Sequence, residues 1–110
     1  MARNVQQPET EQGFQDAVVE FAQLNGWKVA HFRQGRTATG WSTPVAYDGR
    51  GFPDLVLVRE RVVFVECKAE RGALTKEQKA WRDAIEAAGD EWYCWRPGDW
   101  DEVQRVLGRH

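Results

Sequence analysis

The sequence predicts an α/β protein in which helices flank one mixed β-sheet, and three observations support this prediction. Apolar residues recur with helical spacing near the start of the chain and again in residues 75–89. Two β-branched, apolar runs, residues 54–58 and 61–68, lie between these helices. A further strand-like run, residues 91–97, follows the second helix. The expected order of elements is helix, three strands, helix, strand and helix.

The first helix begins at Thr10, whose side chain can cap it, and Gly26 marks its end. Its core-facing side contains four residues at positions i, i+4, i+7 and i+8, namely Phe14, Val18, Phe21 and Ala22. Residues 1–9 before it are expected to be a flexible tail, and residues 27–32 after it predict the first strand. Residues 33–53 are rich in Gly, Thr, Ser and Pro, which predicts one long loop.

The second helix has the clearest sequence pattern. Thr75 and Gln78 form a capping box, T-x-x-Q, at its start, and Gly89 ends it. Its buried stripe is expected to contain Trp81, Ala84, Ile85 and Ala88. After the last strand, which Pro97 ends, Asp99 and Glu102 repeat the capping pattern before a short helix over residues 100–107.

Size and composition describe a single domain over residues 10–110. Apolar residues make up 42% of the 110 residues, which is enough for a core, and the net charge of −2 does not by itself indicate a nucleic-acid partner. No apolar run approaches the ~20 residues of a membrane span. Cys67 and Cys94 lie in separate strand-like runs without metal-ligand spacing, so we expect reduced thiols and an intracellular, cytoplasmic location.

Charged residues lie on the two central strands, where apolar ones are expected. If Glu60 is the midpoint of a hairpin, paired residues have numbers that sum to 120, and Asp54 then lies opposite Glu66. Side chains two positions apart share a face, so Lys68 projects to the same side as Glu66. Pro53 fixes the backbone before Asp54. The sequence therefore predicts two carboxylates and an ammonium group at one place.

Two opposed carboxylates repel each other unless a cation lies between them. Mg²⁺ prefers oxygen ligands and often binds one or two carboxylates together with substrate phosphates. Lys68 could polarise a water molecule or stabilise charge that develops on a phosphate. The alternative is structural, because Asp next to Pro and Gly often starts strands through turn chemistry alone and Glu-x-Lys pairs are common on solvated strand faces.

The set Pro53-Asp54 with Glu66-Cys67-Lys68 resembles the signature of the PD-(D/E)XK nuclease superfamily. More narrowly, residues 10–95 resemble the small stand-alone form of the VRR-NUC (virus-type replication-repair nuclease) family. The resemblance implies a restriction-endonuclease-like core and a metal-dependent DNA endonuclease with Mg²⁺ or Mn²⁺. It also implies branched substrates such as Holliday junctions or flaps, a homodimer, and a phage-like setting.

The resemblance assigns a role to each site residue. Asp54 and Glu66 would hold the metal ion, helped by the backbone carbonyl of Cys67. Lys68 would position or activate the attacking water. Gln78 corresponds to the family's glutamine on the following helix, although as part of the capping box it could simply bond back to the backbone of Thr75.

The family also places an acid on the first helix, and the sequence offers Glu11 and Glu20. Glu11 continues the core-facing side of that helix, whereas Glu20 is displaced by about 200° from Val18 and should face water. We therefore select Glu11, although an acid at a helix start is also favoured by the helix dipole alone.

DNA contacts are expected from the long loop. Arg33, Arg36 and Arg50 could bind phosphates, and Trp41 could stack on a nucleobase, although a merely solvated loop fits these residues equally well. Two other functions remain open at this point. One is a catalytically silent DNA-binding or assembly module with a nuclease fold, and the other is a restriction-type duplex endonuclease.

Overall fold

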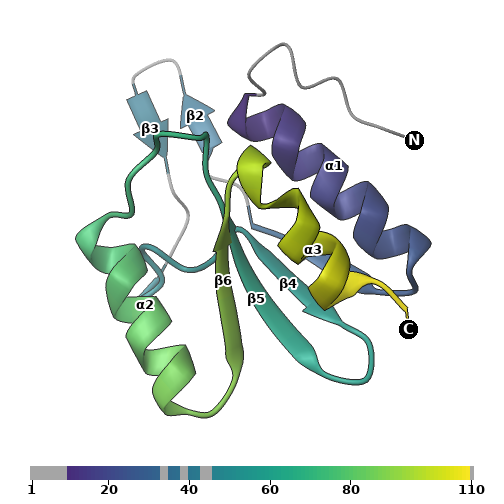
Figure 1. The fold of residues 1–110 in the computed structure, drawn as a ribbon. Helices are drawn as coiled ribbons and strands as arrows, with labels where there is room; N and C mark the ends of the chain where they lie inside the picture. The colour runs from purple at the N-terminus through teal and green to yellow at the C-terminus, as the bar shows by residue number, and fades with distance from the viewer. Residues whose placement is uncertain (1–9, 33–34, 38–39, 43–45, 110) are drawn as a thin grey trace.

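The computed structural model describes residues 10–32, 35–37, 40–42 and 46–109, which form a mixed β-sheet with helices on both faces (Figure 1). The α-helices are α1 (Glu11–Leu24), α2 (Lys76–Ala87) and α3 (Trp100–Leu107). The strands of the sheet are β1 (Lys28–His31), β4 (Leu55–Val58), β5 (Val62–Cys67) and β6 (Glu91–Trp95). This arrangement confirms the predicted α/β class with a mixed central sheet flanked by helices.

The sheet has the order β1-β4-β5-β6, with antiparallel pairing up to β5 and a parallel pair of β5 and β6. A parallel pair requires a long crossover, which α2 provides. In the β4–β5 hairpin, Leu55 pairs with Val65 and Val58 pairs with Val62. The predicted register, in which the paired numbers sum to 120, is therefore confirmed.

The prediction of an unstructured loop over residues 33–53 is wrong in part. Two short antiparallel strands, β2 (Gly35–Thr37) and β3 (Gly40–Ser42), form a separate two-stranded sheet within it. The frequent Gly residues indicated a loop instead of strands, because strand preference depends on pairing context more than on intrinsic propensity.

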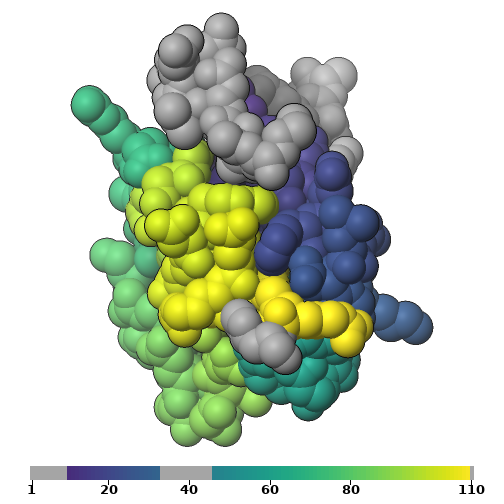
Figure 2. Space-filling view, turned by 45° about the vertical axis from the view of Figure 1, so that its right-hand side comes forward, coloured from purple at the N-terminus to yellow at the C-terminus, as the bar shows by residue number. Residues whose placement is uncertain are grey.

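The main core lies between the sheet and the pair α1 and α3. Alternate residues of the strands point into it, among them Leu55, Leu57, Val63 and Val65, which are fully buried. The helices contribute Phe14, Val18 and Ala22 from α1 and Val103, Val106 and Leu107 from α3. Figure 2 shows α3 (yellow) lying side by side with α1 (blue to purple) on this face of the molecule.

The opposite face of the sheet is covered less completely, by α2 and the segment that leads into β4. Phe52 fills the space there, with T-shaped ring contacts to Trp81 at 5.0 Å and to Phe64 at 6.1 Å. Ala84 and Ala88 are exposed, so the predicted buried stripe of α2 is wrong for these two residues. No other described element packs over α2, and Ile85 is its buried residue.

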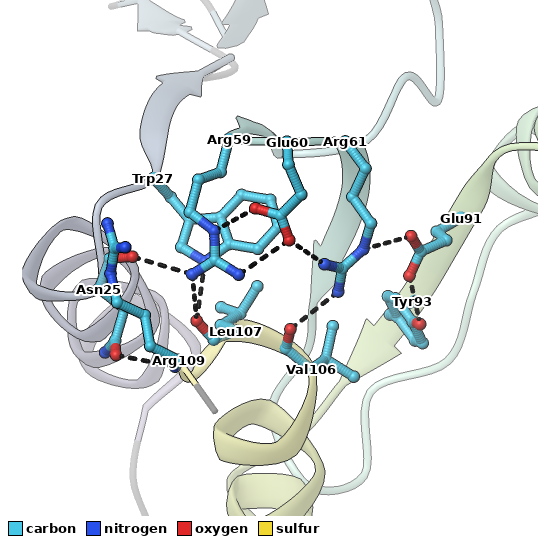
Figure 3. Close-up of polar contacts among 10 residues, drawn as sticks. All are labelled: Asn25, Trp27, Arg59, Glu60, Arg61, Glu91, Tyr93, Val106, Leu107 and Arg109. Carbon is cyan, nitrogen blue, oxygen red and sulfur yellow. Dashed lines mark hydrogen bonds and ion pairs between the residues drawn. The ribbon is translucent and has the colours of Figure 1, made fainter.

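The turn of the β4–β5 hairpin is joined to the C-terminal end of α3 by two arginines (Figure 3). Arg59 donates to the carbonyl oxygens of Asn25 and Leu107, and its guanidinium lies 4.5 Å from the ring centre of Trp27. Arg61 donates to the carbonyl oxygen of Val106 at 2.9 Å. Carbonyl groups at a helix end lack partners within the helix, so these bonds satisfy them and close the end of the core.

The start of α3 differs from the predicted capping pattern. Asp99 is the N-cap residue but accepts no capping hydrogen bond from α3, and its side chain accepts instead from the backbone N–H of Arg96. Glu102 accepts from the indole N–H of Trp95 at 2.8 Å. A 3₁₀ turn, η1 (Pro97–Asp99), precedes the helix and turns these side chains away from the expected box.

Within the described residues, no helix combines the length and apolar character that crossing a bilayer requires. Cys67 and Cys94 are free thiols, as predicted, with Cys67 buried and Cys94 half-buried.

Candidate active site

A cavity of about 370 Å³ lies where β4 begins and β5 ends, between the N-terminal ends of α1 and α2. It is lined by Glu11, Gln12, Gln15, His31, Phe32, Asp54, Glu66, Lys68, Thr75 and Gln78. Five side chains predicted to act in catalysis therefore meet in one cavity, although they come from four separate segments of the chain.

Asp54 and Glu66 come together because the β4–β5 register brings the start of β4 beside the end of β5. Asp54 directly precedes β4, and one of its carboxylate oxygens accepts the backbone N–H of Cys67 at 3.0 Å. This bond fixes Asp54 against the end of β5, beside Glu66. The backbone carbonyl of Asp54 in turn accepts the N–H of Phe32 at 2.8 Å, which ties the same residue to β1.

Glu66 is almost fully buried, with 2% of its surface exposed. One carboxylate oxygen accepts the amide of Gln78 at 2.8 Å, whereas the other, Oε1, has no hydrogen-bond partner among the described residues. Burial, and then the neighbouring Asp54 carboxylate, raise the pKa of Glu66 above its usual range. Without a further cation, the ionised form of this group is therefore unfavourable.

These features fit a divalent cation. An orphaned, buried carboxylate oxygen next to a second carboxylate supplies the hard oxygen ligands that Mg²⁺ prefers. No group of three or more His, Cys, Asp or Glu side chains in the described part of the chain is arranged to hold a metal. A site built on Asp54 and Glu66 therefore needs ligands from the backbone, from water or from substrate, as is usual for Mg²⁺.

Gln78 makes the capping contacts and also contacts Glu66, while its role in the site stays a prediction. The side-chain oxygen of Gln78 accepts the backbone N–H of Thr75 at 2.9 Å, and the Thr75 hydroxyl accepts the backbone N–H of Gln78 at 3.1 Å. The same amide group donates to Glu66 through its nitrogen. The capping box thus fixes the amide in the orientation in which its N–H reaches the carboxylate.

Lys68 follows β5, and its backbone N–H donates to the carbonyl of Trp95 at 3.0 Å. Its half-buried side chain lines the cavity, and its positive charge favours the ionised form of Glu66. Lys68 is thus a cation at the edge of an otherwise acidic site.

The first-helix acid in this cavity is Glu11. Glu20 lines a different cavity, together with Phe21, Leu24 and Trp100. The helical geometry that favoured Glu11 therefore agrees with the position of both residues. The catalytic role of Glu11 stays a prediction.

Gln15 was missed by the sequence analysis. It lies one turn after Glu11 on α1 and is only 6% exposed, yet its amide makes no hydrogen bond to a described residue. The remaining exposed surface opens on the cavity that Gln15 lines. A buried amide with free donors can bind an oxygen of a substrate. The sequence feature that could have indicated Gln15 is its position one helical turn after Glu11, on the apolar face of the helix.

The predicted DNA-binding arginines do not line this cavity as far as the structure describes them. Arg50 is exposed and lines a separate cavity of about 770 Å³, beside Tyr47 and α2. Arg33 and the side chain of Arg36 lie outside the described residues, as does the side chain of Trp41. The DNA-binding role of all three arginines stays a prediction.

The segment before β4 brings Asp54 close to α2. Gly51 has a φ of +83°, and a Cβ atom there would lie 2.6 Å from the carbonyl carbon of Glu77. Only glycine permits this backbone approach. Pro53 is fully buried and leads directly into Asp54. The close contact fixes the distance between the strand that carries Asp54 and the helix that carries Gln78.

A mixed sheet with two carboxylates and a lysine at the end of its central hairpin is typical of restriction-endonuclease-like nucleases. Comparison with known families agrees, because the family model of the VRR-NUC domain matches residues 6–94. The chain belongs to the VRR-NUC family, as its sequence predicted. This domain implies a nuclease-type function in DNA processing, with DNA as a partner. No significant match was found among curated proteins or among solved structures.

Proposed function

We propose that this protein is a Mg²⁺- or Mn²⁺-dependent endodeoxyribonuclease that acts on branched DNA such as Holliday junctions or flaps. The single observation that supports it best is the pairing of Asp54 with the buried Glu66, whose second oxygen lacks a partner, beside Lys68. Replacing one of these two carboxyl groups by an uncharged side chain would stabilise the fold, because neighbouring buried carboxylates disfavour each other's ionised form. Their presence therefore favours a functional role.

In this proposal Asp54 and Glu66, with the backbone carbonyl of Cys67, hold the metal ion. When bound, the ion neutralises charge on the phosphate and lowers the pKa of a water molecule. Lys68 donates to the attacking water or to the phosphate oxygens, and its positive charge stabilises the negative charge that develops there. Gln78 keeps the Glu66 carboxylate in place.

Glu11 lies on the opposite wall of the cavity from α2, because α1 supplies it. A carboxylate at that position can accept a proton from water or bind a hydrated ion through its solvent shell. We assign it this auxiliary role, since it does not complete a group of three metal-ligating side chains.

The test is cleavage of labelled junction, flap and linear duplex DNA with Mg²⁺, with Mn²⁺ and with EDTA. We expect metal-dependent products on the branched substrates, and no products from Asp54→Ala or Lys68→Ala. Circular dichroism checks that both variants are folded. If the folded protein gives no metal-dependent product on any substrate, the proposal is refuted.

A catalytically silent DNA-binding module is the second candidate, and salt-sensitive DNA binding without cleavage would favour it. A restriction-type enzyme is a third, and it would give discrete fragments from long duplex DNA. We further propose a homodimer, because cutting two strands symmetrically calls for two sites related by a two-fold axis. Sedimentation that returns a monomer at micromolar concentration would argue against the dimer.

A further inference from the structure

Phe32 is a large aromatic side chain that remains 52% exposed at the catalytic cavity. Other exposed large apolar side chains lie elsewhere, with Leu24 and Tyr47 lining separate cavities. Among the described residues, Phe32 is thus the exposed aromatic group that adjoins Asp54, Glu66 and Lys68. Covering this apolar surface with a ligand would therefore contribute favourable binding free energy.

The backbone fixes Phe32 next to Asp54. Phe32 follows the end of β1, and its N–H donates to the carbonyl oxygen of Asp54 at 2.8 Å. A phosphate that approaches the Asp54 carboxylate therefore brings its neighbouring nucleotides close to this ring.

The ring of Phe32 is supported from inside the protein. It makes a T-shaped contact with Phe52, with centroids 5.3 Å apart and planes at 86°. Phe52 in turn contacts Trp81 and Phe64, so a chain of aromatic rings continues into the packed side of the sheet. Such edge-to-face contacts restrict the ring orientation while the residue stays 52% exposed.

We propose that Phe32 stacks on a nucleobase next to the scissile phosphate, and that the preferred substrate is unpaired or unstacked at that nucleotide. This inference rests on the proposed nuclease function. In a continuous duplex both faces of a base are covered by its neighbours, so an aromatic side chain gains a stacking surface only at a flap, an end or a branch point. Stacking needs no particular base, because every base has a π face.

The charges around the ring agree with this choice. The Glu11 and Asp54 carboxylates repel a second phosphate, and Lys68 serves the scissile phosphate in the proposed mechanism. Among the described residues, His31 is the further basic side chain that lines the cavity. An uncharged base face is the part of a nucleotide that can approach Phe32 without that repulsion. Stacking on Phe32 would thus contribute to DNA affinity at a place where phosphate binding contributes little.

The experiment measures equilibrium binding of the full chain to flap and junction DNA by fluorescence anisotropy, with Ca²⁺ in place of Mg²⁺ to keep the DNA intact. Abasic sites are placed one at a time at the nucleotides around the branch. For the wild type, one abasic position should weaken binding by about 5- to 150-fold. Phe32→Leu should weaken the binding of intact DNA by the same factor. In this variant the abasic site should have no further effect on binding.

Phe32→Trp should restore both the affinity and the sensitivity to the abasic site, which separates stacking from a loss of packing. Leu24→Ala is the control, because Leu24 is 77% exposed but lines a different cavity. It should leave the abasic effect unchanged.

The inference is overturned if Phe32→Leu and the wild type respond equally to every abasic position. It is also overturned if Phe32→Leu lowers the sedimentation coefficient without changing the abasic effect. Phe32 would then lie in an interface between two copies of the chain. Absence of any DNA binding would end both this inference and the proposed function. Cleavage without any abasic effect would support the nuclease function but refute the stacking contact. An abasic effect without cleavage would support the stacking contact in a catalytically silent DNA-binding module.

Discussion

The carboxyl group of Glu66 is buried beside Asp54, and in the absence of a cation this arrangement is unfavourable. One of its oxygens has no partner in the described part of the protein, and burial raises its pKa. In the proposed function the residue combines a cost in stability with a role as metal ligand, since perturbed pKa values cluster at functional sites.

Glu66→Gln should therefore stabilise the metal-free protein while it abolishes cleavage. Because its pKa is raised, Glu66 must take up a proton on folding at neutral pH, and Gln avoids this cost of about 1–3 kcal/mol. Each kcal/mol shifts the Tm of a domain near this size by about 4–8 °C. Thermal unfolding in EDTA measures this gain. Addition of Mg²⁺ should raise the Tm of the wild type but not of the variant.

Glu20→Gln is the matched control, because Glu20 is an exposed acid away from the cavity. It should change neither the Tm in EDTA nor the response to Mg²⁺. A Glu66→Gln variant that melts below the wild type in EDTA would contradict the predicted gain in stability.

Gln15→Leu should lower cleavage without unfolding the protein. Leucine preserves most of the packing volume of this buried side chain but removes the free amide donors. If the amide binds a charged oxygen of the substrate, its loss costs about 1.5–3 kcal/mol, or roughly a 10- to 150-fold decrease in kcat/KM. Steady-state kinetics with Tm as a stability check measures both effects, and Gln23→Leu on the exposed side of α1 is the control.

At the level of elements, the segment that enters β4 and the start of α2 act together. The β4–β5 register and the bond from the Cys67 N–H hold Asp54 beside Glu66, and the capping box of α2 orients Gln78 toward Glu66. The close approach at Gly51 joins these two units. The geometry of the candidate site thus depends on backbone contacts outside the residues that line it.

Gly51→Ala should impair both stability and cleavage, whereas Gly89→Ala should impair stability alone. Both glycines have a positive φ, +83° and +90°, so both alanines introduce backbone strain of about 1–2 kcal/mol. Only at Gly51 does the added Cβ meet backbone atoms, because no atom lies within 4 Å of the corresponding position at Gly89.

The measurement is chemical denaturation together with the cleavage rate for each variant. The difference between the two alanine variants isolates the close contact with α2. Equal losses of stability, with full activity in both, would mean that the contact does not position Asp54.

At the scale of the whole molecule, the candidate active-site cavity and the arginine cluster of Figure 3 lie at opposite ends of the central hairpin. The site is at the end where β4 begins, and the turn at Arg59 and Arg61 closes the core against α3. One pair of strands therefore carries both the chemistry and the attachment of the C-terminal helix.

Arg59→Ala should lower the Tm more than Arg82→Ala, with little change in the chemistry at the distant cavity. Arg59 donates to two backbone carbonyls and lies over Trp27, whereas Arg82 forms a salt bridge with its exposed neighbour Asp83. Exposed pairs of that kind contribute little to stability. Differential scanning fluorimetry compares the two, and equal Tm values would show that the cluster does not hold α3.

Much of this molecule could be predicted from its sequence. The helix periodicity, the two caps at Thr10 and Thr75 and the alternation in the central strands are local patterns, and the structure agrees with each of them. The opposed acids followed from the same local logic, since hairpin register depends on the position of the turn.

Other features were decided only by tertiary packing. Which helix faces are exposed among the described residues, as at Ala84, depends on which elements pack beside α2 and not on the sequence of α2 itself. The β2–β3 pair depends on two short segments finding each other within a Gly-rich stretch.

The positions of Gln15 and Phe32 at the cavity were likewise set by tertiary structure, because each comes from an element distant in sequence from Asp54 and Glu66. The sequence by itself determined the elements and the acid pair, since these depend on near neighbours along the chain. Only the folded chain decided what surrounds that pair, because long-range contacts are set by how whole elements pack together.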